Sequence, residues 1–598
     1  MDFLALQRLS EPNSPPSMLN RVLASILAAT LLASCAAATY SRQDTDTLTS
    51  PAVDAYSAGV VGSADPRATA AGEAILAKGG SATDAAIAVM LALTVVEPQS
   101  SGIGGGGFFV RADANGQVTT IDGRETAPSA AGPDWFLGED GAPVARRTAV
   151  QSGLSIGVPG NIALAAEAHR KHGKIAWSEL FEPAIRLAEE GFVMNPRLAK
   201  SLDGMIERAG ADLAMRTLFY TPDGNVRNVG SVIVRKDLAE TFRVIANRGP
   251  AAMYGPDAAA QLAKFVSSKT PRQFTMSARD IFQYRPADRE PVCGSYRSYR
   301  VCGMGPPSSG GMAVLQILGL LERFDLASMG PQAVTFWHLY LEAQELAYAD
   351  REVFIADPDF VSVPVVGLLD QDYLDRRSRL LDTKSATPYP PAGQPAGLVE
   401  LHETGEGPDE GGTSHLVAVD AKGTMVSYTS TIEGAFGSGL AFGGYHLNNE
   451  LTDFSFVPRK GDVTVANRVE AGKRPRSSMA PTVVYDPQGK PFLAIGGGGG
   501  MFIPISTARS IIGVIDFGLS LEEALGMPLL MGFPGGVYIE SNSMLAERRE
   551  QLEGLGHKIV RESPLPFGSV STVAAMRTDD GWVAAYDPRF KGKLAAPD

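Results

Sequence analysis

The hydrophobic and polar positions divide the chain into a helical first part and a later part that is richer in strands. Residues 70–97 read as two helices separated by a pair of glycines, and the second is apolar on nearly every face. Ser81 or Thr83 is expected to cap this second helix, and Pro98 to end it. Because a helix without a polar face must be covered on all sides, the pattern places it inside a domain.

Strand patterns dominate the last third of the chain. Residues 414–420 and 424–432 alternate between apolar and polar positions around a short turn, which predicts a β-hairpin. Residues 481–500 repeat the order of strand, turn and strand and end in five consecutive glycines. Helical segments fill much of 150–290 and return between 505 and 555. This order of elements predicts a layered arrangement of the α+β or α/β kind.

Composition and charge exclude several classes of function. The 598 residues are 44% hydrophobic and 20% charged, which is typical of a globular protein. A net charge of −13 argues against nucleic acid as a partner, because binding to phosphates needs a basic face. The glycines of 102–107 match a dinucleotide-binding pattern, but no strand precedes them and a strand, not a helix, follows. We therefore expect no nucleotide cofactor at this point.

Metal ligands are also not expected. The seven histidines include no HExxH pattern, and three cysteines are too few for a zinc knuckle. His169 and His172 lie three residues apart on a probable helix, but Arg170 and Lys171 between them favour a solvated face. The sequence thus predicts neither a metal site nor another cofactor.

The N-terminus has the features of an export signal. Arg21 precedes an apolar run that is too short for a comfortable membrane span and ends in Leu-Ala-Ser-Cys at Cys35. This ending resembles the lipobox of bacterial lipoproteins, so residues 1–35 are predicted to be a signal peptide and Cys35 to be lipidated. Met18 is a natural alternative start, and a plain secretory signal is the alternative to lipidation. Either way the mature protein is expected to be exported. We expect it to lie in the periplasm and, with Cys35 lipidated, to contact the membrane only through that lipid.

Export bears on the two remaining cysteines. Residues 292–303 read as a hairpin that turns at Arg297 and Ser298, which sets Cys293 opposite Cys302. An oxidising compartment permits a disulfide between them. Two free buried thiols are the alternative.

A proline-, glycine- and acid-rich segment, 387–412, separates the helical part from the strands and is predicted to be a flexible linker. It ends in Gly411 and Gly412 directly before Thr413 at the head of a strand. If the bond between Gly412 and Thr413 is cut, Thr413 carries both a hydroxyl and a free α-amine. That amine, with an ordinary pKa of about 7.7–8.0, is a suitable base for the hydroxyl. The glycine pair is expected to permit strained backbone angles at the cut.

Longer motifs around this threonine resemble those of the gamma-glutamyltranspeptidase family of N-terminal-nucleophile hydrolases. They occur in family order along nearly the whole mature length: ILAKGGSATDAAIAV, GIGGGGFFV, DGRETAP, PPSSGG, GTSHLVAVDAKGTMVSYTSTIEGAFGSG, NNELTDFS and KRPRSSMAPTVV, followed by the glycine run. The resemblance implies a four-layer αββα sandwich of the α+β class. It also implies two autocleaved fragments, 36–412 and 413–598, which stay together as a heterodimer.

The resemblance further implies roles for individual residues. Thr413 would be the nucleophile and Thr431 would orient its hydroxyl, while the backbone N–H groups of Gly499 and Gly500 would form the oxyanion hole. A zwitterionic γ-glutamyl end would be bound by six side chains, with Arg124 and two serines on the carboxylate and three acids on the ammonium: Arg124, Ser477, Ser478, Glu433, Glu450 and Asp453.

The implied reaction is transfer of a γ-glutamyl group from glutathione or a related compound, through an acyl-Thr413 intermediate, to water or to an amino acid or peptide. Two departures from the family pattern concern specificity: position 433 is glutamate where many members have asparagine, and 454–476 is short and lacks an aromatic lid residue. One alternative is an acylase for glutaryl side chains of β-lactams. Another is a non-catalytic, exported solute-binding lipoprotein.

Overall fold

The computed structural model describes residues 59–400, 402–404, 412–564, 570–590 and 593. All of them belong to one compact unit, residues 52–598. The predicted signal peptide, 1–35, and its lipidation site Cys35 lie outside the described residues, as does Gly411.

Two six-stranded sheets form the centre of the described structure. The first has the order β1 (Gly59–Ser63), β9 (Gly412–Asp420), β10 (Met425–Glu433), β2 (Gly106–Ala112), β3 (Val118–Asp122) and β6 (Ala287–Arg289). The second has the order β21 (Gly581–Tyr586), β20 (Ser571–Thr578), β16 (Pro491–Gly498), β15 (Thr482–Tyr485), β8 (Tyr299–Gly303) and β7 (Val292–Tyr296). All neighbouring strands are antiparallel. Each sheet therefore takes strands from both sides of the bond between Gly412 and Thr413.

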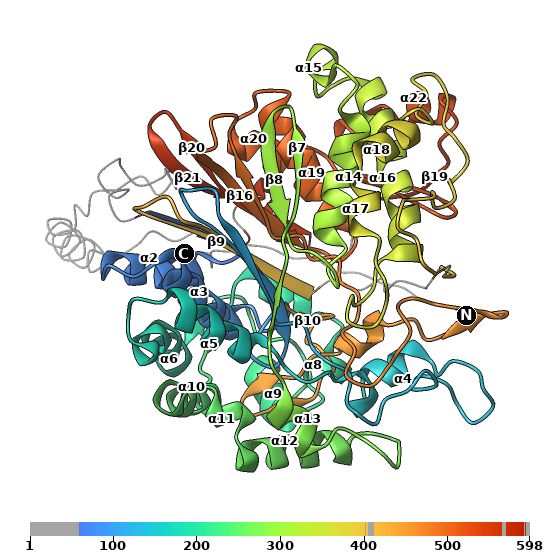
Figure 1. The fold of residues 1–598 in the computed structure, drawn as a ribbon. Coiled ribbons are helices and arrows are strands. Elements are labelled where there is room, and N and C mark those ends of the chain that lie inside the picture. The colour runs from blue at the N-terminus through green and yellow to red at the C-terminus, as the bar shows by residue number, and fades with distance from the viewer. Residues whose placement is uncertain (1–58, 401, 405–411, 565–569, 591–592, 594–598) are drawn as a thin grey trace, which may run out of the picture. The chain divides into compact units, whose positions relative to one another are not determined.

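Helices cover the outer face of each sheet (Figure 1). On the first sheet these are α2 (Pro66–Ala77), α3 (Ala82–Val96) and α5 (Asn161–His172), and on the second α14 (Gly310–Leu321), α19 (Phe502–Ile515) and α20 (Leu521–Gly526). The inner faces meet where β9 and β10 pack on β16 and β20. The predicted four-layer αββα sandwich of helices and sheets is thus confirmed.

The local predictions for α3 are confirmed. Ser81 is its N-cap: the Ser81 hydroxyl accepts from the Asp84 N–H at 3.1 Å, and Asp84 accepts from the Ser81 N–H at 2.8 Å. Thr83 lies one position inside the helix, and the helix ends at Val96, just before Pro98. Every residue of α3 is buried, which explains its lack of a polar face.

The cysteine hairpin has the predicted register. Cys293 pairs with Cys302 across β7 and β8, and the turn residues Arg297 and Ser298 have φ values of 49° and 68°. The two sulfurs are joined in a disulfide whose Cα atoms are 4.1 Å apart.

The remaining helices form two groups. The first group lies between β3 and β6 along the chain and matches the predicted helical region: α4 (Arg146–Val150), α6 (Glu182–Glu190), α7 (Pro196–Leu202), α8 (Ile206–Ala209), α9 (Leu213–Phe219), α10 (Lys236–Arg248), α11 (Ala251–Tyr254), α12 (Pro256–Ser268) and α13 (Ala278–Gln283). The second is α15 (Leu326–Met329), α16 (Val334–Phe354), α17 (Val365–Leu368), α18 (Gln371–Ser378), α21 (Met544–Glu547) and α22 (Arg549–Gly554). Within this second group α16 packs on α14 and so forms part of the cover over the second sheet.

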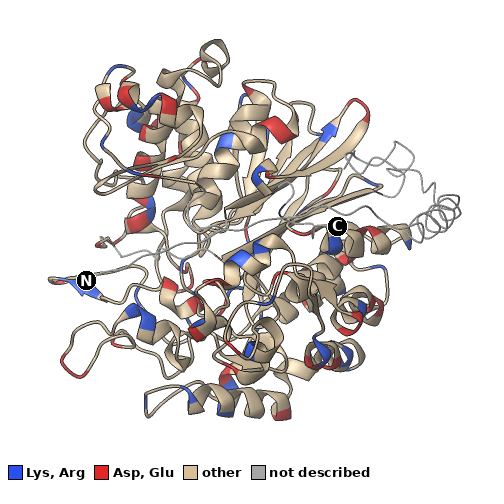
Figure 2. Ribbon diagram, turned by 180° about the vertical axis from the view of Figure 1, so that it is seen from behind, with Lys and Arg blue, Asp and Glu red and all other residues tan. Residues whose placement is uncertain are grey.

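Smaller strands lie outside the two main sheets. They form one three-stranded sheet, β17 (Leu530–Phe533), β18 (Gly536–Glu540) and β19 (Ile559–Ser563), and the pairs β4 (Phe192–Val193) with β5 (Val232–Ile233), β11 (Ala441–Phe442) with β12 (Tyr445–His446), and β13 (Arg459–Lys460) with β14 (Val463–Thr464). Within the described ranges, no helix has both the length and the apolar character needed to cross a membrane. Acidic and basic residues are interspersed over the described elements (Figure 2).

The first part of the predicted linker is described and lies against α16. The Thr387 N–H donates to Glu342 at 3.1 Å, and the Gly393 N–H donates to Asp350 at 2.8 Å. Residues 401 and 405–411 of the linker lie outside the described residues.

Candidate active site

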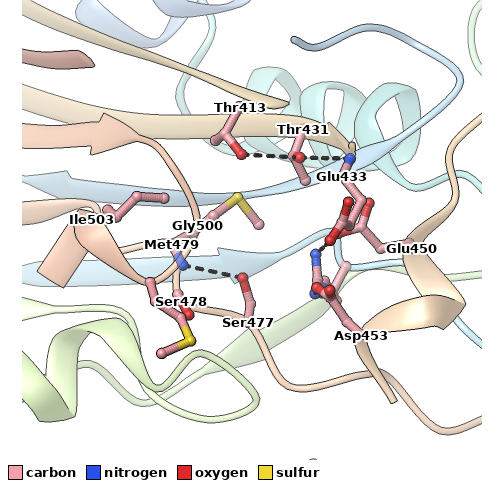
Figure 3. A pocket seen from close by; sticks show the side chains of 12 residues that line it. Thr413, Thr431, Glu433, Glu450, Asp453, Ser477, Ser478, Met479, Gly500 and Ile503 are labelled. Carbon is pink, nitrogen blue, oxygen red and sulfur yellow. Dashed lines mark hydrogen bonds and ion pairs between the residues drawn. The ribbon is translucent and has the colours of Figure 1, made fainter. Parts of the chain in front are cut away.

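The hairpin of β9 and β10 brings two threonines together. Thr413 and Thr431 are direct partners in the strand register, and their hydroxyl oxygens lie 3.2 Å apart (Figure 3). Both side chains are buried, with 5% and 2% of their surfaces exposed. The hairpin predicted from alternation therefore also fixes the spacing of the two candidate catalytic hydroxyls.

Hydrogen bonding orients the Thr413 hydroxyl. Thr431 Oγ1 donates its single proton to the Gly412 carbonyl at 2.9 Å and accepts from the Glu433 N–H at 2.8 Å. Because that proton is already used, Thr413 is the donor in the bond between the two hydroxyls. The lone pairs of Thr413 Oγ1 are thus left for an electrophilic carbon.

A bulge follows this pair of residues. The register shifts between Thr431 and Glu433, and Glu433 has a φ of 73°, which is unusual for a residue with a side chain. A Cβ at Gly412 would lie 2.7 Å from the backbone carbon of Gly434. The glycines before Thr413 were predicted to permit strained backbone angles, and for Gly412 that prediction is wrong. Its φ lies outside the left-handed region, and the requirement is close approach of the bulged strand.

The glycine run ends β16 beside the nucleophile. A Cβ at Gly498 would lie 2.2 Å from the Thr413 carbonyl oxygen, so this position has room only for glycine. Gly499 and Gly500 follow with φ values of 119° and 57° and turn the chain toward α19. Gly500 lines the same pocket as Thr413. Of the two residues predicted to form the oxyanion hole, Gly500 therefore shares the pocket with Thr413, and Gly499 directly precedes it in the chain.

Arg124 is buried at the other end of the pocket. Its guanidinium is paired with the carboxylates of Glu450 and Asp453, and Nη2 also donates to the Arg476 carbonyl at 2.9 Å. The arginine and the acids were expected on opposite sides of a ligand, whereas Arg124 pairs directly with Glu450 and Asp453. A substrate carboxylate would have to share the guanidinium with these two side chains.

Each of these acids also keeps one oxygen available. Glu450 Oε2 and Asp453 Oδ1 are buried and have no hydrogen-bond partner among the described residues. Unpaired buried acceptors are costly, by about 1–3 kcal/mol each. An ammonium group donates three hydrogen bonds and would satisfy both. Glu433 also lines this pocket, and its carboxylate accepts from the Asn449 amide at 3.2 Å.

The predicted serine pair, Ser477 and Ser478, lies across the pocket from Thr413 and Thr431 (Figure 3). Ser478 Oγ accepts from Arg351 Nη2 at 2.7 Å, and Ser477 Oγ accepts from the Met479 N–H at 3.2 Å. Both hydroxyl protons therefore remain available to donate to a ligand carboxylate.

The predicted catalytic and substrate-binding residues, with the exception of Gly499, all line this one pocket. Gly412, at the predicted cleavage site, and the two disulfide cysteines, Cys293 and Cys302, do not line it. The pocket also has an apolar wall that sequence reasoning missed, formed by Met479, Met501 and Ile503. No charge or motif distinguishes these residues in the sequence. They line the pocket together with Thr413 and the charged residues.

Glu125 was also missed, although it stands next to Arg124 in the quoted motif DGRETAP. It is fully buried, and neither carboxylate oxygen has a partner from another described residue. A Cβ at Gly106 would lie 2.5 Å from one of these oxygens, so the carboxyl is enclosed by backbone. Burial raises the pKa of Glu125 to about 8, despite the nearby charge of Arg124.

This shift predicts a dependence of stability on pH. The folded chain keeps the Glu125 proton up to pH about 8, whereas the unfolded chain releases it near pH 4.5. The free energy of unfolding should therefore fall as pH rises from about 4.5 to 8, by up to about 5 kcal/mol from this group. In Glu125→Gln this part of the slope should be lost. Urea unfolding of both proteins between pH 5 and 9 measures it.

A control and a second contributor sharpen that test. Burial also raises the pKa of Glu345 to about 8. In Glu125→Gln, Glu345 should therefore still contribute part of the fall in unfolding free energy with pH. The exposed Glu240→Gln should leave the profile of the wild type unchanged. Parallel profiles for the wild type and Glu125→Gln would contradict the prediction.

Comparison with known proteins agrees with this geometry. A model of the family described as gamma-glutamyltranspeptidase matches residues 68–596. The chain is 36% identical over 533 residues to the glutathione hydrolase proenzyme of Bacillus subtilis (strain 168), covering 87% of this chain and 88% of that protein. It is 34% identical over 548 residues to the glutathione hydrolase proenzyme of Escherichia coli (strain K12), with 90% and 91% covered.

A solved structure supports the fold. The cephalosporin acylase from Bacillus halodurans superposes with a TM-score of 0.76 and 26% identity, over 92% of this chain and 98% of that chain. The family match covers every strand of the two six-stranded sheets except β1, and every residue that lines the pocket. The chain is therefore a member of the gamma-glutamyltranspeptidase family.

Proposed function

We propose that this chain cuts itself between Gly412 and Thr413 and then acts as a γ-glutamyl hydrolase and transferase. The donor is glutathione or a related γ-glutamyl compound, and the acceptor is water, an amino acid or a peptide. Two similar proteins are named glutathione hydrolase proenzymes, which supports both the donor and a precursor that is processed. The fragments on either side of the cut stay together as a heterodimer, since each sheet contains strands from both.

One observation carries the proposal. The Thr413 hydroxyl lies 3.2 Å from that of Thr431, in a pocket whose far end holds Arg124 between two acids. A nucleophile at one end and both charge signs at the other match a γ-glutamyl group, whose reactive carbonyl and zwitterionic end are separated by a short apolar chain.

Self-cleavage uses the threonine pair. The hydroxyl oxygen of Thr413 attacks the Gly412 carbonyl carbon, whose oxygen accepts the proton of Thr431 at 2.9 Å. The C–N bond breaks, the Thr413 nitrogen takes the proton that the Thr413 hydroxyl gives up and becomes an amine, and an ester joins Gly412 to Thr413 Oγ1. Water hydrolyses this ester, leaving a carboxylate on Gly412 and a free hydroxyl on Thr413.

The same hydroxyl then acts on substrate. The α-amine of Thr413 takes the hydroxyl proton while the oxygen attacks the γ-carbonyl carbon, and the N–H groups of Gly499 and Gly500 stabilise the oxyanion. The proton passes to the leaving nitrogen, and an ester to Thr413 forms. Water or an acceptor amine then attacks this ester and restores the hydroxyl.

Recognition of the charged end follows from the buried groups. Arg124 and the two serine hydroxyls donate to the substrate carboxylate, and the unpartnered oxygens of Glu450 and Asp453 accept from its ammonium. A glutaryl group has the carboxylate but no ammonium, so it leaves both acceptors unsatisfied. Sites built around such hydrogen bonds discriminate strongly against analogues that lack the donor.

Paired substrates test the function. The purified protein should hydrolyse a γ-glutamyl anilide with a kcat/KM at least about 100-fold above that for the glutaryl anilide. Added glycylglycine reports on transfer. A preference for the glutaryl anilide would instead indicate an acylase, the activity named for the similar structure from Bacillus halodurans. Turnover of neither substrate would favour the non-catalytic binding protein.

Export and lipidation are part of the proposal and rest on sequence alone. The apolar run after Arg21 and the small residues before Cys35 favour removal of the residues that precede Cys35 and attachment of a lipid to Cys35, which becomes the mature N-terminus. The mature enzyme would then face the periplasm, tethered to a membrane by that lipid. Mass spectrometry of the mature N-terminus tests this.

A further inference from the structure

A buried cluster of two histidines and a glutamate lies at α16. His338 and Glu342 are four residues apart on this helix, and His557 follows α22. One ligand atom from each of the three side chains lies within 4.8 Å of the others. All three residues are buried, with exposed fractions of 0%, 2% and 6%. None of them lines the active-site pocket.

The hydrogen bonds of His338 fix its tautomer. Its Nε2 lies 2.6 Å from the Asp382 carbonyl oxygen, which only accepts, so Nε2 carries the proton in the neutral ring. The lone pair is then on Nδ1, which lies 2.7 Å from His557 Nε2. A backbone carbonyl that holds the far ring nitrogen is the usual second partner of a metal-binding histidine.

Glu342 supplies a second, independent observation. One of its oxygens, Oε2, accepts from the N–H and the hydroxyl of Thr387. The other, Oε1, is buried without a hydrogen-bond partner among the described residues. A buried carboxylate oxygen with no partner is costly unless a cation or a donor fills the place opposite it.

We propose that His338, Glu342 and His557 bind one divalent transition-metal ion of the zinc type. Two imidazoles and a carboxylate are common zinc ligands, and they leave a fourth position for water. Ligand atoms about 2.1 Å from a tetrahedral ion are about 3.4 Å apart, so the two imidazole nitrogens need to separate only slightly. On binding, His557 carries its ring proton on Nδ1 instead of Nε2, so Nε2 is free to bind the ion and both rings stay neutral. No local pattern in the sequence predicts this metal site, because His557 is far from His338 and Glu342 along the chain.

The position points to a structural role. Glu342 is nine residues from Arg351, which holds Ser478 in the active-site pocket, so about 14 Å of helix separates the ion from that wall. His338 and Glu342 precede Thr413, whereas His557 follows it. If the chain is cut as proposed above, the ion joins the two fragments. Binding itself does not depend on the cut.

Zinc binding is tested on the whole protein. Chelator-treated wild type is mixed with one equivalent of Zn²⁺ and desalted, and the bound zinc is measured by mass spectrometry. We expect one zinc per chain, and a melting temperature higher by a few degrees than that of the zinc-free protein. Uncut Thr413→Ala should bind equally, which separates this proposal from self-cleavage.

Two ligand variants and one matched control locate the site. His557→Gln and Glu342→Gln should each reduce zinc affinity at least about tenfold. His169→Gln, a histidine outside the cluster, should bind like the wild type. A competition titration of the wild type with a zinc indicator gives the dissociation constant even if a variant fails to fold. No stoichiometric zinc in the wild type, or unchanged affinity in both ligand variants, would overturn the proposal.

Discussion

Thr413→Ala should leave the protein as one uncut chain with at least about a thousandfold less γ-glutamyl hydrolase activity. The substitution removes the hydroxyl that attacks the Gly412 carbonyl, so the α-amine is never released. Both the nucleophile and its base are lost together. A denaturing gel and an assay with a γ-glutamyl anilide measure the two effects on the same sample.

Two further variants make this result specific. Thr413→Ser keeps a hydroxyl and should still be cut, with a smaller fragment whose N-terminal sequencing begins at position 413. Thr120→Val removes a buried hydroxyl of the same sheet, bonded to the Arg289 carbonyl at 2.6 Å, and should be cut like the wild type. An active, uncut Thr413→Ala protein would exclude the whole mechanism.

Arg124→Lys should raise the KM for a γ-glutamyl anilide about 10- to 100-fold, because lysine keeps the charge but lacks the planar fork of donors. Lysine is chosen since a neutral residue would leave Glu450 and Asp453 buried without a counter-charge, which destabilises folds by about 3–5 kcal/mol. A 4-aminobutyryl anilide, which lacks the α-carboxylate, provides the second readout. The preference of the wild type for the γ-glutamyl compound should shrink in the variant.

A matched arginine separates recognition from stability. Arg377 is also buried and paired with a carboxylate, that of Asp350, but it does not line the pocket. Arg377→Lys should therefore leave the preference between the two anilides unchanged. An equal loss of preference in both variants would remove Arg124 from substrate recognition.

The elements that sequence predicted best are those with local signals. Ser81 caps α3 because its hydroxyl and Asp84 are three residues apart, which is visible in any reading of the chain. The hairpin of β9 and β10 follows from alternation and a short turn. Alternation also sets Thr413 opposite Thr431, although their roles came from the resemblance to a family and not from the pattern.

Contacts between distant segments produce the features that the sequence did not predict. Arg124 and Asp453 are 329 residues apart, and no local pattern shows that they pair directly. His338 and His557 are 219 residues apart, so no local pattern in the sequence identifies either histidine as a metal ligand. The requirement for glycine at position 412 arises from the bulge in the neighbouring strand. Each is a product of tertiary packing, which propensity and periodicity do not encode.

Strand β9 lies between β1 and β10, one strand from each side of the cut. An unbroken polypeptide lets these partners find each other as parts of one molecule, at the modest entropic expense of closing a loop. Two chains made from separate genes would instead have to associate in a bimolecular step, and each would expose unpaired strand edges that favour aggregation. If the chain is cut as proposed, the peptide bond between Gly412 and Thr413 keeps the two parts together during biosynthesis and is needed only until the strands are in register.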